Sequence, residues 1–202
     1  VETVYNQILS DLDNAEQYLN VEEWELGKNY RFNTTSAQAL RARTYLYMGR
    51  RSDALEASKD VLSVYNELED MNNSTTLPNS YKSKESIVAL ERFSSNLYTA
   101  VDMPASEFIS LYRSGDQRRT KYFKRVTSST YSLLKGRSDE FSCSFRTAEF
   151  YLTAAEAAAR LGHTTDAINY LTPLMAKRLN TSAYQTTTAL IGTMTEEELI
   201  QE

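Results

Sequence analysis

Asparagine and tyrosine side chains stand close together in two loops of this sequence. Tyr81 follows Asn79 in a polar, turn-rich stretch, and Tyr98 follows Asn96 in a second stretch. Sugars stack the C–H faces of their rings on flat aromatic rings, while neighbouring amides and carboxylates bind the hydroxyl groups. Asn96, Tyr98 and Tyr81 are therefore the candidate ligand-binding residues. Packing of the same tyrosines on the scaffold is the alternative interpretation.

Two more aromatic residues, Trp24 and Tyr30, lie in a connector at 20–33, where Gly27 and Asn29 allow the chain to turn. Trp24 is the only tryptophan, whereas the chain has 14 tyrosines. Most of the tyrosines fall at helical positions on apolar faces and are expected to pack. The loop aromatics are therefore the ones that could contact a ligand.

A basic stretch runs from residue 113 to residue 137, with Asp116 as its one acidic residue. Its eight basic residues are Arg113, Arg118, Arg119, Lys121, Lys124, Arg125, Lys135 and Arg137. Such a patch could attract an anionic ligand, such as a uronate-containing glycan, or nucleic acid. The favoured interpretation is intramolecular: basic strands face acidic helices, and Asp116 and Arg118 fix a turn. The formal net charge of −5 for the whole chain gives no general reason to expect nucleic acid.

The residue types needed for catalysis or metal binding are scarce. His163 is the only histidine and Cys143 the only cysteine, so neither a zinc site nor a Ser-His-Asp triad is easily built. No carboxylate pair has a spacing that favours glycoside hydrolysis. The sequence therefore predicts that the protein is not an enzyme and that it binds no cofactor and no metal.

Two matching segments position these residues. Gly162 lies 113 residues after Gly49, and Ala155 likewise lies 113 residues after Ala42, so the two segments align with each other. Each segment has the pattern of a helix, a glycine turn and a second helix. A helical pair rich in small residues cannot bury its apolar face alone and must stack on a neighbour, as tetratricopeptide-type pairs do.

Hydrophobic periodicity and turn residues predict the other elements. Helices are expected at 2–19, 106–111 and 146–161. Three more helices are expected to begin at a capping residue: one at Thr35 or Ser36, which runs to residue 48, one at Ser52, which runs to residue 65, and one at Thr165. A strand is possible at 87–90, and a β-hairpin at 122–126 and 130–134. Pro173 is expected to end a helix near Tyr170.

Three ordered motifs resemble one known family, the SusD/RagB proteins. Residues 37–49, AQALRARTYLYMG, resemble its A-x-A-L-x-A-R-x-Y-L-Y-x-G pattern. Residues 111–118, LYRSGDQR, are similar to L-Y-x-x-x-D-x-R, and residues 146–157, RTAEFYLTAAEA, to R-x-A-E-x-Y-L-x-x-A-E-A. The order of the three motifs agrees as well.

The resemblance implies a mainly α protein: tetratricopeptide-like helical pairs with a small irregular or β insertion at about 70–145. It implies one domain over 1–202, expected to be a fragment of a longer protein. It also implies a surface-exposed outer-membrane lipoprotein of Bacteroidetes that binds glycan or a related nutrient for a TonB-dependent transporter. The lipid-modified cysteine of the family is expected outside this chain. The stretch between Leu90 and Ser106 is shorter than the aromatic-bearing excursion of many family members.

Two other functions remain open. A helical-repeat adaptor would hold a protein or peptide in an exposed concave groove. A degenerate family member would only pack on the transporter. A glycan binder, in contrast, needs exposed aromatic residues clustered at one loop edge.

Overall fold

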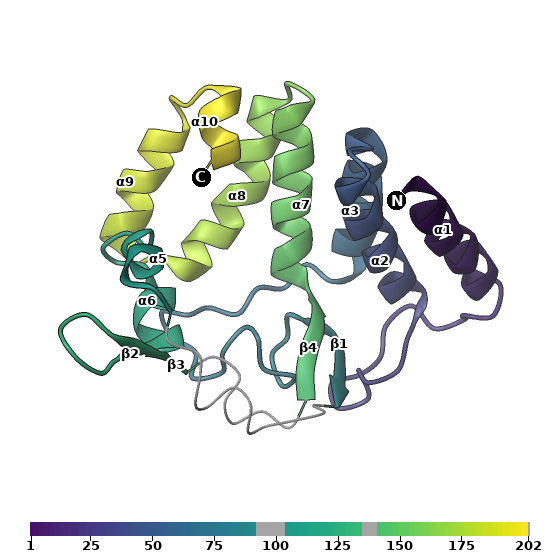
Figure 1. The fold of residues 1–202 in the computed structure, drawn as a ribbon, viewed down its shortest axis with the longest axis horizontal. Helices are drawn as coiled ribbons and strands as arrows, with labels where there is room; N and C mark the ends of the chain where they lie inside the picture. The colour runs from purple at the N-terminus through teal and green to yellow at the C-terminus, as the bar shows by residue number, and fades with distance from the viewer. Residues whose placement is uncertain (92–103, 135–140, 202) are drawn as a thin grey trace.

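The computed structural model describes residues 1–91, 104–134 and 141–201, and most of these residues are helical (Figure 1). The nine helices in the described ranges are α1 (Glu2–Glu16), α2 (Thr34–Tyr47), α3 (Arg51–Val64), α5 (Ser106–Ser110), α6 (Gln117–Tyr122), α7 (Thr147–Arg160), α8 (Thr164–Arg178), α9 (Thr181–Ile191) and α10 (Glu196–Gln201). The strands are β1 (Ser86–Glu91), β2 (Phe123–Arg125), β3 (Tyr131–Leu133) and β4 (Phe141–Arg146). The predicted mainly α class is confirmed.

Gly49 and Gly162 end α2 and α7 with the same turn. Their φ angles are +73° and +77°, a region that glycine enters at little cost. In the first pair, the Arg50 amide donates to the Tyr45 carbonyl at 2.9 Å, and the equivalent bond in the second pair has the same length. These bonds form the Schellman motif, which closes a helix on a left-handed residue. The two predicted helical pairs are confirmed.

The predicted caps of α2, α3 and α8 are wrong. Asn33 caps α2, because its side chain accepts from the Ser36 amide at 2.7 Å while the Ser36 hydroxyl accepts from the Asn33 amide at 2.8 Å. Thr35 lies inside the helix. α3 and α8 begin directly after their glycine turns, so that Ser52 and Thr165 already lie in the first helical turn.

The two helical pairs pack against each other through α3 and α7. Ala54 and Leu55 of α3 form a buried cluster with Ala154, Ala157 and Ala158 of α7. Small side chains at a contact shorten the distance between helix axes. The helices α1, α2, α3, α7 and α8 therefore stand side by side in that order (Figure 1).

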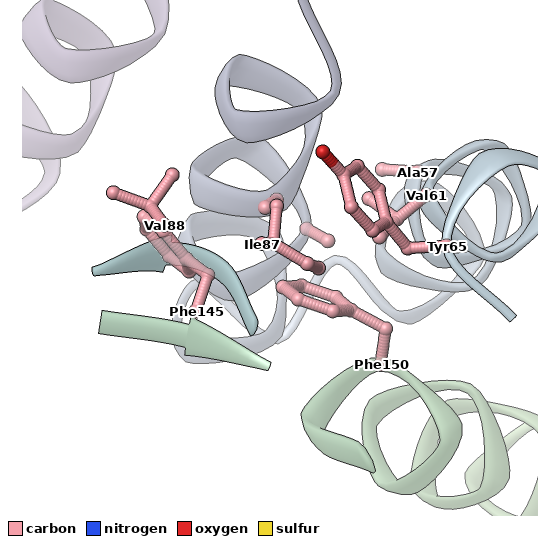
Figure 2. Packing of buried hydrophobic residues seen from close by; sticks show 9 residues of the cluster. Ala57, Val61, Tyr65, Ile87, Val88, Phe145 and Phe150 are labelled. Atoms are coloured by element: carbon pink, nitrogen blue, oxygen red, sulfur yellow. The ribbon is translucent and has the colours of Figure 1, made fainter. Parts of the chain in front are cut away.

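A second core lies between these helices and the strand pair β1–β4 (Figure 2). Ile87 and Val88 of β1 pack with Phe145 of β4, with Phe150 of α7, and with apolar residues of α2 and α3. The strands are antiparallel with an irregular register. β1 was predicted, but β4 was not, because its pairing joins residues about 55 positions apart and depends on tertiary structure.

α8 continues through Pro173, so the predicted helix end near Tyr170 is wrong. A proline inside a helix costs about 3 kcal/mol. Leu174 and Arg178, which follow it in α8, are both buried. Ending the helix earlier would expose Leu174 and displace Arg178, so the packing of this last part outweighs the cost.

A buried ion pair joins α8 to the loop before β1. Arg178 donates from Nη2 to Glu85 Oε1 at 2.5 Å and from Nη1 to the Glu69 carbonyl at 2.7 Å. The side chains of Arg178 and Glu85 are 5% and 0% exposed. The Glu85 carbonyl also accepts from the Thr147 amide at 2.9 Å. One acidic residue therefore connects β1 to the start of α7 and the end of α8.

The turn before α6 is fixed by Asp116. Its carboxylate accepts from the Arg118 amide at 2.9 Å and from the Arg118 guanidinium at 2.6 Å. The predicted turn formed by these two residues is confirmed. β2 then pairs antiparallel with β3, as predicted for a hairpin.

Gly115, in the same turn, packs directly on the start of α9. A Cβ atom at Gly115 would lie 2.7 Å from Ala183 Cβ and 2.8 Å from Asn180 Oδ1. Asn180 caps α9 by accepting from the Ala183 amide at 2.9 Å, so neither neighbour moves easily. The φ of Gly115 is +87°. We expect Gly115→Ala to lower the free energy of unfolding by about 2–3 kcal/mol in urea denaturation.

Gly49→Ala is the matched control for this prediction. Gly49 also has a positive φ, but a Cβ atom there would meet nothing within 4 Å. Its substitution should cost only the backbone strain, about 1 kcal/mol. Equal losses at Gly115 and Gly49 would contradict the proposed packing contribution.

Candidate functional site

Tyr81 is the one predicted ligand-binding residue that lies within the described ranges. Asn96 and Tyr98 fall in 92–103, outside them. Tyr81 is half-buried, and Lys82 Nζ lies 5.4 Å from the centroid of its ring. Its carbonyl accepts a hydrogen bond from Asn29 Nδ2 at 3.2 Å. The loop of Tyr81 is therefore attached to the connector between α1 and α2.

The connector arranges Trp24 and Tyr30 around one cation. Arg31 Cζ lies 5.3 Å from the centroids of both rings. The Trp24 indole N–H donates to the Phe32 carbonyl at 3.1 Å. These contacts fix the indole before any ligand arrives, so binding would cost little side-chain entropy.

Asn29 holds the connector against β1. Its side chain is buried and donates to Ser86 Oγ at 2.9 Å as well as to Tyr81, while its carbonyl accepts from the Ala89 amide at 2.9 Å. Sequence reasoning treated Asn29 only as a turn residue. It is instead the residue that brings the aromatic connector and the Tyr81 loop to the same irregular face.

A pocket of about 310 Å³ lies between the connector, the end of α3 and the loop before β1. Its aromatic residues are Trp24 and Tyr65, and its polar residues include Glu23, Asn29, Asn66, Glu67, Ser83, Lys84 and Ser86. An indole surface beside carboxylates, an amide and hydroxyls matches the two needs of a saccharide, which are a stacking surface and partners for its hydroxyl groups. The pocket is therefore the candidate functional site.

The charged groups of the pocket remain available to a ligand. Lys84 Nζ lies 3.4 Å from Glu67 Oε2, with the two side chains 48% and 69% exposed. An ion pair with this exposure contributes about 0–1 kcal/mol to stability, so a ligand hydroxyl can replace it at small cost.

Tyr65 also lines the pocket, but its hydroxyl is already used within the protein. Its hydroxyl oxygen accepts from Asn33 Nδ2 at 3.2 Å, and burial raises the pKa of Tyr65. Tyr65 is therefore a neutral, structural part of the pocket.

The sequence predicted no metal and no catalytic site, and it identified His163 as the only histidine. His163 is exposed at the start of α8. In the described ranges, no group of three or more His, Cys, Asp or Glu side chains could hold a metal ion. None of the helices in those ranges combines the length and the apolar character that crossing a membrane requires.

Comparison with known proteins identifies the family. The model of the SusD family matches residues 25–202. Among curated proteins, no sequence matches the chain. The match confirms the resemblance that the three motifs indicated.

Solved structures with this fold include proteins of Bacteroides species. A SusD superfamily protein of Bacteroides fragilis is 21% identical with a TM-score of 0.75, and the match covers 98% of this chain and 49% of that one. A SusD-like carbohydrate binding protein of Bacteroides vulgatus is 20% identical with a TM-score of 0.66, covering 98% and 48%.

Surface glycan-binding protein A of Bacteroides uniformis is 16% identical with a TM-score of 0.64, and the match covers 98% of this chain and 56% of that one. The chain thus spans about half the length of the solved structures that it matches. At these identities the likeness shows a shared fold, and the family model carries the assignment. On that evidence, the chain belongs to the SusD family.

Proposed function

We propose that this protein is a non-catalytic binding subunit that captures an oligosaccharide or a related nutrient at the cell surface. The observation that carries the proposal is the fixed indole of Trp24 beside the carboxylates of Glu23 and Glu67 and the amide of Asn66. Two structures of the same fold are described as carbohydrate-binding and glycan-binding proteins. Membership of the SusD family supports the same ligand class.

We further propose a partner and a location for the protein. A TonB-dependent, SusC-like outer-membrane transporter receives the captured ligand, and a lipid anchor outside this chain attaches the protein to the outer membrane. Family membership supports both proposals. The helices stand side by side in one layer (Figure 1), which is a broad face for a transporter, while the pocket lies among the connector, the end of α3 and the loop before β1.

A glycan array tests the ligand class. The 202-residue chain is incubated with neutral glycans from plants, microbes and hosts, and the ligands found are then titrated by calorimetry. We expect saturable binding of at least one neutral oligosaccharide. Absence of binding to every neutral glycan on the array would contradict the Trp24 pocket as a saccharide site.

A second candidate function, binding of a protein or peptide segment, is favoured by an apolar cleft between α1 and α2. The cleft has a volume of about 570 Å³, and its lining includes Leu12, Ala15, Tyr18, Phe32 and Leu40. A peptide-binding adaptor would use such a groove. Peptides selected from a display library whose binding is lost in Ala15→Glu, but kept in Trp24→Ala, would favour this function over saccharide binding.

A further inference from the structure

A second pocket, of about 440 Å³, lies between α6 and the β2–β3 hairpin. Gln117 and Arg119 line it from α6, and Phe123, Arg125 and Tyr131 line it from the hairpin. Its volume falls in the range of small-molecule sites, about 300–1,000 Å³. The pocket lies within the basic stretch that the sequence singled out.

The register of the hairpin explains which side chains reach this pocket. Phe123 and Arg125 lie on the same face of β2 because side chains alternate along a strand. Tyr131 is the cross-strand partner of Arg125, whereas Lys124 pairs with Ser132 on the opposite face. One face of the hairpin therefore presents a guanidinium beside aromatic rings.

The Arg125 guanidinium is held in place by the hairpin loop. Its Nε donates to the Thr127 carbonyl at 3.0 Å, and its Nη2 donates to the Ser128 carbonyl at 2.8 Å. A guanidinium has five N–H donors, so three of them make no hydrogen bond to the described residues. A fixed arginine with unused donors is suited to binding a carboxylate.

The basic side chains around this pocket are not neutralised by acidic side chains of the described residues. Within the described residues, no acidic side chain pairs with Arg119, Lys121, Lys124 or Arg125, and Lys121 Nζ instead donates to the Ser74 carbonyl at 2.8 Å. Among the described residues, these four basic side chains therefore do not have the acidic partners that the sequence predicts. Asp116, the acid that lines the pocket, is bound by the Arg118 guanidinium.

We infer that this pocket binds an acidic saccharide, with a uronate carboxylate accepting from Arg119 and Arg125 and the sugar ring against Tyr131. The inference rests on the proposed saccharide binding, because the charge alone specifies only an anion. The aromatic ring beside the two arginines adds the apolar surface that a sugar ring needs. The protein thus has an anion-selective site separate from the pocket of Trp24.

Calorimetry with an oligogalacturonate and with its methyl ester tests this inference. The ester keeps the sugar chain and removes the charge, so we expect it to bind about tenfold or more weakly. Arg125→Gln should weaken oligogalacturonate binding by about tenfold or more. Lys124→Gln removes the same charge from the opposite face of β2 and should change affinity by less than about threefold.

Three results would overturn the inference. One is equal binding of the ester and the acid. Another is equal loss in Arg125→Gln and Lys124→Gln, which would indicate diffuse charge attraction. A single-stranded DNA oligonucleotide that binds as tightly as the oligogalacturonate, with the same dependence on Arg125, would overturn the assignment to a saccharide. Thermal melting of each variant confirms that it is folded.

Neutral oligosaccharides separate this inference from the proposed function. Arg125→Gln should leave their binding unchanged. If neutral glycans bind and the oligogalacturonate does not, the inference fails and the proposed function stands. If only the oligogalacturonate binds, and does so through Arg125, the Trp24 pocket is not the site and the inference stands.

Discussion

Replacement of Arg178 by methionine is expected to lower the free energy of unfolding by about 3–5 kcal/mol. The Glu85 side chain is fully buried. Without Arg178, the Glu69 amide at 2.8 Å would be its remaining donor, and Glu85 Oε2 has no hydrogen-bond partner among the described residues. A buried carboxylate without a counterion is costly, and this one connects α7, α8 and β1. Urea denaturation measures the loss.

Lys177→Met is the matched control for Arg178→Met. Lys177 Nζ lies 3.7 Å from Asp70 Oδ2, with the two side chains 42% and 29% exposed. This substitution removes the same charge one residue earlier and should cost less than about 1 kcal/mol. The double variant Glu85→Gln/Arg178→Met should recover part of the stability, because an amide needs no counterion. If Arg178→Met lowered the free energy of unfolding no more than Lys177→Met does, the buried ion pair would not stabilise the fold as proposed.

Trp24→Ala is expected to weaken neutral oligosaccharide binding by about thirtyfold or more, about 2 kcal/mol. The indole is the largest aromatic ring system among the residues that line the pocket, and its hydrogen bond to Phe32 and its contact with Arg31 fix its orientation. Trp24→Phe should keep part of the affinity, because a smaller ring still stacks on a sugar. Calorimetric titration of the glycan selected on the array measures both variants.

Tyr18→Ala is the control for the loss of an exposed aromatic ring. Tyr18 is 84% exposed in the turn that follows α1 and does not line the Trp24 pocket. Its removal should leave neutral glycan affinity unchanged. Unchanged affinity in a folded Trp24→Ala variant would remove this pocket from the proposal.

The helical pairs could be predicted because their signals are local. Gly49 and Gly162 each end a helix through bonds within six residues, and the apolar period of the flanking helices is visible in the sequence. The cap of α2 was mispredicted although it is local, because the sequence offers several polar residues at 33–36 and Asn33 is the one that bonds back to Ser36. The course of α8 through Pro173 was mispredicted because tertiary contacts decide it. Leu174 and Arg178 hold the end of α8 in place through contacts with Leu68, Glu69 and Glu85, which are distant in the sequence.

The candidate site could be predicted only in part. Trp24, Tyr30 and Tyr81 stood out as loop aromatics, but only Trp24 lines the pocket, and no pattern in the sequence predicts that the connector and the Tyr81 loop lie together. Their arrangement depends on Asn29, whose hydrogen bonds reach residues more than 50 positions away. The pocket also requires the end of α3 to lie beside the connector. Such long-range contacts leave no periodic signal.

The fluorescence of Trp24 tests the central claim most directly, because it is the only tryptophan in the chain. The neutral glycan is titrated into the protein while emission and acrylamide quenching are recorded, with calorimetry in parallel. If the Trp24 pocket is the site, the emission shifts and quenching falls, with the same midpoint as the heat of binding. Saturable heat without any change in Trp24 emission or quenching would contradict the account.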